Sequence, residues 1–402
     1  MSCPVEYWIW LQRTLGTGKD TEELLSYFGD PRKIYEAGRK NLLMSGIINH
    51  KIADSLAMFS PSESYTVIKQ CENNGWKIIT YDDENFPPML RNLSDSPVVL
   101  YVHGDEKVLK SQLCIGIVGT RNASEYGIKA AKDISYSLAK TGTVIVSGGA
   151  VGIDAAAHSA AIEAGGKTVA FLGSGLGSDY LMENEKLRQN IAANGALVSE
   201  FLPFTPPTRF SFPVRNRLIS GMCKGTIVVE AGEKSGSIIT AKNAIKQGRD
   251  IFAVPGEIFN KKHAGTNYLI NNGAVPVFGV SDVIDYYSDI IMELNGGIIP
   301  EVHSNFRMSE ESHTEKKIQV TWETVKKEPP ARKKQEKAQL PEFATENAKK
   351  LYGIITEDAK TADEYVIETG MSVQDVLSAI TELELYGIVM MHSGKRYGLK
   401  IN

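Results

Sequence analysis

Short apolar runs alternate with helical segments between residues 77 and 254, and this alternation constrains the fold more than any other feature of the sequence. The runs are rich in Val, Ile and Leu, and most are separated by segments rich in Ala, Lys and Glu. Strands that are apolar on both faces, with helices between them, predict a parallel sheet covered by helices on each side. The expected strands are residues 77–81, 98–103, 113–118, 143–147, 167–172, 196–199, 226–230 and 250–254.

The rest of the chain divides into three parts. Residues 1–75 show helical apolar spacing interrupted by glycines, which predicts a small helical domain of the SAM or helix-hairpin-helix kind. The sheet domain then spans residues 76–300. Residues 301–342 are rich in Lys, Glu, Ser and Pro and lack periodicity, which indicates a charged flexible linker. Residues 343–402 predict three helices and a β-hairpin, which is the pattern of a winged helix.

The third helix of this winged helix, residues 372–385, is acidic. It contains Asp375, Glu382 and Glu384 and neither Lys nor Arg. A helix that enters the major groove normally brings Arg, Lys, Asn or Gln to the base edges. The sequence therefore favours a protein-contacting role for this domain over reading of DNA.

Charge and cysteine content exclude several classes of protein. The formal net charge of -4 over 402 residues argues against a protein that coats nucleic acid by bulk charge, so a nucleic-acid site must be a focused patch. Cys3, Cys71, Cys114 and Cys223 form no CxxC pair, so neither a disulfide framework nor a metal site is expected. No apolar run reaches the roughly 18 residues of a membrane span. We expect a reduced cytoplasmic protein that contacts no membrane and binds no cofactor.

Residues 205–224 form a positive segment that also carries aromatic rings. No Asp or Glu occurs between Glu200 and Glu230. Cations hold phosphates and rings stack on bases, which is the combination that single-stranded DNA requires. Prolines at 206, 207 and 213 predict extended backbone here. The cations are Arg209, Arg215, Arg217 and Lys224, and the rings are Phe210 and Phe212.

Two glycine-rich turns follow neighbouring expected strands. The first, IGIVGTR, ends at Arg121, and the second, VIVSGGAVGID, contains Ser147, Gly148 and Gly149. Backbone amides in glycine turns and at helix N-termini bind phosphates, and ligands of parallel sheets lie at the carboxyl ends of the strands. The pair predicts an anion-binding cleft. The alternative explanation is that the glycines only allow helices to pack closely on strands.

A third turn, at residues 235–237, also precedes the start of a helix, and Lys242 follows it.

The sequence contains no catalytic motif with the required spacing. GGKT at residues 165–168 has Ala161 where a Walker A loop needs glycine, and no GxSxG or GxGxxG occurs. His158, on an Ala-rich helix, is expected to be a packed helix residue. We therefore predict no catalytic residue.

The blocks IGIVGTR, VSGGAVGIDAAAH, VAFLGSGL, FPVRNRLISG, VVEAGEKSGSIITA, GRDIFAVPG and GTNYLI, in this order, closely resemble the DNA processing protein A family, also called DprA or Smf. The resemblance implies an extended Rossmann fold that dimerises, binds single-stranded DNA without sequence preference and loads the RecA recombinase during natural transformation. It implies no enzymatic activity. Its DNA-binding residues fall on Arg121, Ser147, Gly148, Gly149, Arg209, Phe212, Arg215, Asn216 and Arg217, and we add Lys242.

Two other functions compete with this one. A nucleotide-binding, phosphoribohydrolase-like enzyme has a similar fold, but it needs a PGGxGT-like turn where this chain reads EAGEKSGSIIT. A winged-helix regulator of duplex DNA is disfavoured by the acidic third helix. Release of base from nucleoside monophosphates would identify the first, and preference for duplex over single strands the second.

Overall fold

The computed structural model describes residues 3–179, 184–300, 340–341, 344–356, 360–392 and 396–399. Most of the predicted linker, residues 301–339 and 342, lies outside the described residues. The chain forms two compact units, Met1–Glu311 and Ser312–Asn402, which we describe separately.

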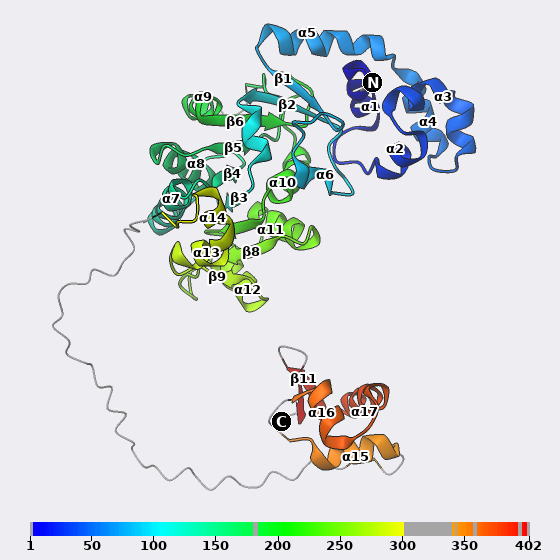
Figure 1. Ribbon diagram of the computed structural model, residues 1–402, viewed down its shortest axis with the longest axis vertical. Coiled ribbons are helices and arrows are strands. Elements are labelled where there is room, and N and C mark those ends of the chain that lie inside the picture. The colour runs from blue at the N-terminus through cyan, green and yellow to red at the C-terminus, as the bar shows by residue number, and fades with distance from the viewer. Residues whose placement is uncertain are drawn as a thin grey trace, which may run out of the picture. The chain divides into compact units, whose positions relative to one another are not determined.

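The first unit is built on a nine-stranded sheet in the order β1-β2-β6-β5-β4-β3-β7-β8-β9 (Figure 1). The neighbours from β6 to β9 pair in parallel, as predicted. The strands are β1 (Lys77–Thr80), β2 (Val99–Gly104), β3 (Cys114–Val118), β4 (Val144–Ser147), β5 (Thr168–Phe171), β6 (Gly195–Ser199), β7 (Gly225–Val228), β8 (Asp250–Ala253) and β9 (Val275–Pro276).

The predicted parallel sheet has an antiparallel edge, where β2 runs antiparallel to both β1 and β6. A parallel connection needs a crossover of a dozen or more residues, usually a helix. Between β1 and β2 the chain forms only the four-residue helix α6 (Pro88–Arg91). The chain therefore turns back beside β1.

Helices cover both faces of the sheet because successive strand residues point to opposite sides. Ile115 and Ile117 of β3 belong to one core, and Cys114 and Val118 belong to the other. The first core is closed by α7 (Glu125–Lys140), α8 (Ile153–Glu163), α13 (Ser281–Tyr286) and α14 (Ser288–Leu294). The second is closed by α6, α10 (Ser211–Met222), α11 (Gly236–Lys246) and α12 (Ala264–Asn271).

The N-terminal region is helical, as predicted, and it shares a core with the β2 side of the sheet. Trp8, Ile9 and Leu11 are buried in the same cluster as Val99 and Tyr101 of β2. The described helices are α1 (Val5–Leu15), α2 (Glu22–Phe28), α3 (Pro31–Met44), α4 (His50–Met58), the 3-10 helix η1 (Pro61–Ser64) and α5 (Tyr65–Asn73); α9 (Glu185–Asn194) packs on the same cluster. Because this core is continuous with the sheet, the N-terminal region and the sheet form one compact unit.

The second unit is a winged helix, as predicted. It contains α15 (Glu346–Ile354), α16 (Ala362–Thr369), α17 (Val373–Leu385) and a sheet in the order β10-β12-β11, in which β10 (Lys360–Thr361) joins the hairpin of β11 (Val389–His392) and β12 (Arg396–Leu399). Glu382 of α17 accepts hydrogen bonds from the Thr345 amide and hydroxyl. One of the acidic residues of α17 therefore stabilises the start of α15. Among the described residues of both units, no helix is long and apolar enough to cross a membrane.

Candidate functional site

A cleft of about 250 Å³ lies at the carboxyl ends of β3, β4 and β7. Strand β3 pairs with β4 on one side and with β7 on the other, so the chain order reverses there. In parallel sheets this reversal point is where ligands bind. The lining residues are Val118, Gly119, Thr120, Arg121, Ala150, Asp154, Phe212, Arg215, Asn216, Ile219, Ser235, Gly236, Ser237 and Thr240. All three predicted turns therefore contribute to one cleft.

Arg215 enters the cleft from α10 and is held by main-chain carbonyls. Its Nη1 donates to the carbonyls of Gly148, at 2.6 Å, and Phe171, and its Nε donates to Asn216 Oδ1 at 3.1 Å. These neutral acceptors fix the orientation of the guanidinium at the cleft. The nearby carboxyl of Asp154 is buried, which raises its pKa, and Arg215 opposes the rise.

Arg121 and Phe212 meet across the mouth of the cleft. The Arg121 guanidinium carbon lies 5.0 Å from the centre of the Phe212 ring, within the range of a cation–π contact. Arg121 is exposed and follows β3, whereas Phe212 belongs to the first turn of α10. The contact places the Arg121 guanidinium over the Phe212 ring, so that a cation and an aromatic ring meet at the cleft.

A small hollow beside the cleft adds one residue that sequence reasoning missed. Arg188 of α9 lines it together with Arg121 and Arg215, and Gly148 and Gly149 form part of its wall. The Arg188 side chain is buried, and its Nη2 donates to the Leu176 carbonyl at 3.0 Å. The available signal was a cation in the segment after the GSGLG turn, but nothing in its spacing pointed to the cleft.

Ser147 and Gly148 are placed differently from the prediction. Ser147 is fully buried, and its hydroxyl donates to the Ile117 carbonyl at 2.5 Å, so it joins β4 to β3 and does not line the cleft. The Gly148 amide donates to Asp154 Oδ2 at 3.2 Å. Asp154 stands in the first turn of α8, where the helix dipole favours a carboxylate. The Gly148 amide is therefore already bonded to a carboxylate of the protein.

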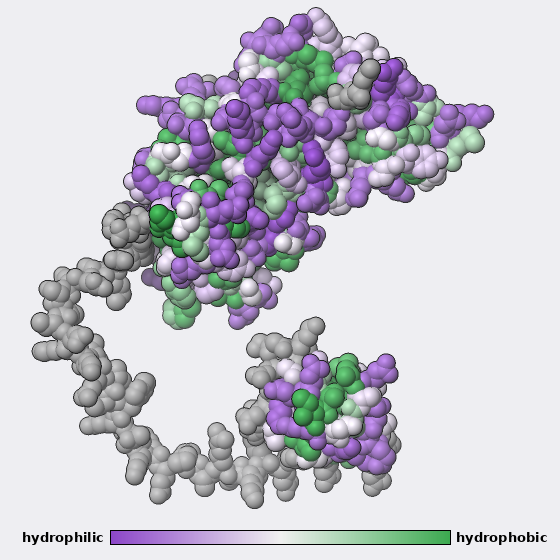
Figure 2. All heavy atoms as spheres, in the orientation of Figure 1, coloured by the Kyte–Doolittle hydropathy of each residue, from purple (hydrophilic) through white to green (hydrophobic). Residues whose placement is uncertain are grey.

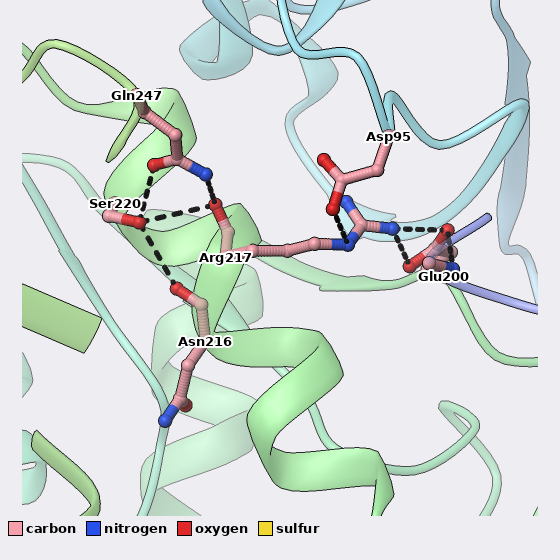
Figure 3. Close-up of polar contacts among 7 residues, drawn as sticks. Asp95, Glu200, Asn216, Arg217, Ser220 and Gln247 are labelled. Atoms are coloured by element: carbon pink, nitrogen blue, oxygen red, sulfur yellow. Dashed lines mark hydrogen bonds and ion pairs between the residues drawn. The ribbon is translucent and has the colours of Figure 1, made fainter. Parts of the chain in front are cut away.

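Arg217 also requires a correction, because it points toward Glu200 and Asp95 (Figure 3) and does not line the cleft. Its Nη2 donates to both carboxylate oxygens of Glu200 at 2.7 Å, and its Nε lies 3.3 Å from Asp95 Oδ2. The prediction considered acidic residues only within residues 200–230. Asp95 lies in a distant segment, and Glu200 stands at the end of that range.

The extended backbone predicted around Pro213 is wrong, and this explains why the two arginines separate. Residues 211–222 form α10, in which Pro213 lies in the first turn. Proline is tolerated there because the first amides of a helix have no intrahelical partner. In a helix, residues two apart point in different directions. Arg215 therefore faces the cleft and Arg217 the opposite side.

Lys242 and Arg209 lie outside the residues that line the cleft. Lys242 is exposed on α11, of which only the first part, up to Thr240, reaches the cleft. Arg209 is exposed, and its guanidinium stacks at 4.7 Å on the ring of Phe210. The prediction of a packed His158 agrees with the structure, since its Nδ1 lies 2.7 Å from Thr168 Oγ1 and burial, helped by Arg215, lowers its pKa to about 3.

A second, larger hollow of about 580 Å³ lies between α7 and α8. It is lined by the cations Lys129 and Lys132 but also by Glu125, Asp133 and Glu163. An anion would meet more carboxylates than cations there. The cleft at β3 is the better anion site.

We expect Gly148→Ala to lower the affinity of the cleft for an anion by displacing Arg215. A Cβ at Gly148 would lie 2.6 Å from Arg215 Nη1, and a long side chain can move away from such a clash. The guanidinium would leave its position, with a loss of roughly tenfold or more in affinity, as for one charge-assisted hydrogen bond. Gly236→Ala is the matched control, since it lines the same cleft and its Cβ would meet nothing within 4 Å. Equal affinities of the two variants in a titration would contradict this assignment.

Fold and cleft together define a class: a doubly wound α/β protein with a cation- and ring-lined cleft at the switch point of its sheet. The chain belongs to the family described as DNA recombination-mediator protein A, which it matches over residues 77–288, and it matches the DprA winged helix domain over residues 332–395. The recognition of the DprA/Smf family from the sequence is thus confirmed.

Individual relatives agree with this assignment. The DNA processing protein DprA of Bacillus subtilis (strain 168) is 39% identical over 219 residues, which are 54% of this chain and 74% of that protein. Protein Smf of Synechocystis sp. is 33% identical over 336 residues, 83% of this chain and 82% of that protein. The X-ray structure of DprA from Streptococcus pneumoniae superposes with a TM-score of 0.63 at 32% identity, covering 71% of this chain and 98% of that one.

Proposed function

We propose that this protein is a recombination mediator that holds single-stranded DNA, without sequence preference, in the cleft at β3, and that it does so without catalysing a reaction. The observation that carries the proposal is the convergence of Arg121, Phe212 and Arg215 in one cleft of the central fold. Guanidinium forks bind phosphate oxygens, and an aromatic face accepts any base. The amide of Asn216 also lines the cleft, and Gly148 and Gly149 form the wall beside it.

Competition between strand types tests this proposal. We expect single-stranded oligonucleotides of mixed sequence to displace a labelled single strand at similar concentrations, and duplex of the same sequence to require much higher ones. The reason is that rings can stack only on unpaired bases. Removal of the winged helix, residues 343–402, is expected to leave this preference unchanged. Preferential displacement by duplex would contradict the proposal and favour a regulator of duplex DNA.

We also propose that the chain forms a homodimer through the sheet domain. Apolar side chains are exposed in segments that adjoin β8, β9 and α12, namely Ile258, Phe259, Tyr268 and Phe278, and Phe259 is 94% exposed. Figure 2 shows apolar residues at the surface near this end of the first unit. Large exposed apolar groups on a polar protein indicate a protein contact. Two clefts on one strand would bind with a higher effective concentration than one.

We expect Phe259→Asp to convert the dimer to a monomer and to weaken binding of a long single strand by roughly 100-fold, the lower range of an avidity effect. Sedimentation velocity and binding titrations measure the two effects. Binding of an oligonucleotide too short to span two clefts is the internal control and is expected to change little. A wild-type chain that sediments as a monomer at all concentrations would refute the dimer.

We further propose that the bound strand is passed to RecA during natural transformation. The support is the family itself, whose description is a recombination mediator. Faster assembly of RecA on a strand already covered by single-strand binding protein is the expected readout. No acceleration at any concentration of this protein would remove this step and leave strand binding intact.

A further inference from the structure

The buried ion pair behind α10 is the part of the molecule that strand binding leaves unexplained. Arg217 and Glu200 are 5% and 4% exposed, and neither lines the cleft. A buried ion pair is weak evidence for stability, because removing two charges from water is costly. Arg217 lies on the side of α10 opposite to Arg215, and this position indicates a role other than stability.

Glu200 accepts hydrogen bonds from three residues, two of them in the N-terminal region and one in α10. Its carboxylate accepts from Arg217 Nη2 (Figure 3) and from the Gly18 amide at 3.2 Å. Its main-chain carbonyl accepts from Gln12 Nε2 at 2.6 Å. Gln12 also donates to the Val99 carbonyl and accepts from the Tyr101 hydroxyl. The network therefore joins α1, β2, the end of β6 and α10.

Gly18 also lies close to α10. Gly18 has a φ of +66°, and a Cβ there would lie 2.9 Å from Val214 Cγ1 and 3.4 Å from Arg217 Nε. Val214 precedes Arg215 in the helix. Gly18 of the N-terminal region thus packs closely against α10, next to the residue that enters the cleft.

The other end of α10 has its own attachment. Gln247 Nε2 donates to the Arg217 carbonyl at 2.9 Å, and the Ser220 hydroxyl lies 2.6 Å from Gln247 Oε1. This attachment holds the C-terminal half of the helix to the end of α11. The half that carries Phe212 and Arg215 is held by the bonds of Arg215 to the Gly148 and Phe171 carbonyls and by Ser211, whose hydroxyl donates to the Gly173 carbonyl. Arg217, next to this half, links it to Glu200.

We propose that Glu200, acting through Arg217 and supported by the N-terminal segment at Gly18, is a positioning residue that sets α10 and with it Arg215 for single-stranded DNA. This inference rests on the proposed function of the cleft. It assigns Arg217 no phosphate contact. It also gives the N-terminal helical region a direct role in the geometry of the cleft.

The test replaces Glu200 by its neutral isostere. Glu200→Gln keeps an acceptor for the Gly18 amide but leaves the buried Arg217 without its main counter-charge. We expect affinity for single-stranded DNA to fall roughly tenfold, as for one misplaced charge-assisted hydrogen bond. The slope of log Kd against log salt should stay close to that of the wild type, because the Arg215 charge remains near the phosphate although its hydrogen bond is misaligned. Glu163→Gln, the same change at an exposed site of α8, is the matched control and should bind as wild type.

Recovery of affinity by a second substitution distinguishes a positioning role from a general loss of folding. The double variant Glu200→Gln/Arg217→Gln replaces two charges by two amides and should recover most of the affinity, since a neutral pair avoids an uncompensated buried charge. Asp95→Asn is a milder variant, because the Asp95 side chain is 37% exposed, and should shift affinity in the same direction by less. Hydrogen exchange of the amides in α10 and at Gly18 should accelerate in Glu200→Gln even without DNA.

Unchanged affinity in Glu200→Gln or unchanged hydrogen exchange in α10 would overturn the inference. So would a double variant that folds but binds as weakly as Glu200→Gln with a reduced salt slope. A Glu200→Gln chain that fails to fold while the double variant folds and binds supports it. A wild-type protein that does not bind single strands refutes the proposed function instead, and the exchange measurement then still reports on the positioning of α10.

Discussion

Arg215→Ala is expected to reduce the affinity for single-stranded DNA more than any other single change in the cleft. The variant loses one charge-assisted hydrogen bond to phosphate, about 1.5–3 kcal/mol. It also removes the side chain that bonds the carbonyls of Gly148 and Phe171 and so shapes the wall of the cleft. Affinity should therefore fall roughly 10- to 100-fold for all sequences alike. The salt slope should decrease by about 0.7 per phosphate lost.

Fluorescence anisotropy at several salt concentrations measures both quantities. Arg209→Ala is the matched control, because Arg209 lies on the same segment but is exposed and does not line the cleft. We expect it to weaken binding much less than Arg215→Ala. Thermal unfolding of both variants separates lost binding from lost folding. If Arg209→Ala had the larger effect, the strand would have to follow a different path.

Gly152→Ala is expected to lower the free energy of unfolding strongly. Gly152 has a φ of +83°, and a Cβ there would lie 2.5 Å from the Thr120 carbonyl oxygen and 2.6 Å from that of Arg121. The contacts are with backbone, which cannot rotate away. Left-handed strain costs about 1–3 kcal/mol and overpacking about 1–3 kcal/mol more. The turn that carries Arg121 would have to shift, so DNA binding should fall as well.

Gly165→Ala provides the comparison, since Gly165 has a φ of +74° but a Cβ there would meet nothing within 4 Å. It shares the backbone strain and lacks the clash. Chemical denaturation should show a loss for Gly152→Ala that exceeds the loss for Gly165→Ala by at least about 1 kcal/mol. Equal losses would mean that the turn after β3 moves without resistance and that Gly152 does not position Arg121.

The glycine turns show how far the sequence could be interpreted. Their place at the ends of β3 and β4 followed from apolar periodicity, and the structure confirms it. Both explanations offered for them contain part of the answer. Gly152 is required for close packing of the 120–121 backbone, and Gly148 for the position of Arg215. The bare amide expected at Gly148 is instead bound by Asp154.

Local spacing was sufficient to predict strands β1 to β8, the winged helix and the two turns, because apolar periodicity and glycine act over a few residues. The two-residue edge strand β9 (Val275–Pro276) was not predicted, because it is too short to show a periodicity. The roles of Arg215 and Arg217 were beyond such reasoning. They depend on the start of α10 at Ser211, which sets the direction of each side chain, and on Asp95 and Glu200, which reach Arg217 only after the chain folds. Electrostatic pairing is governed by distance in space, so two arginines that are two residues apart in one motif can have different charged partners.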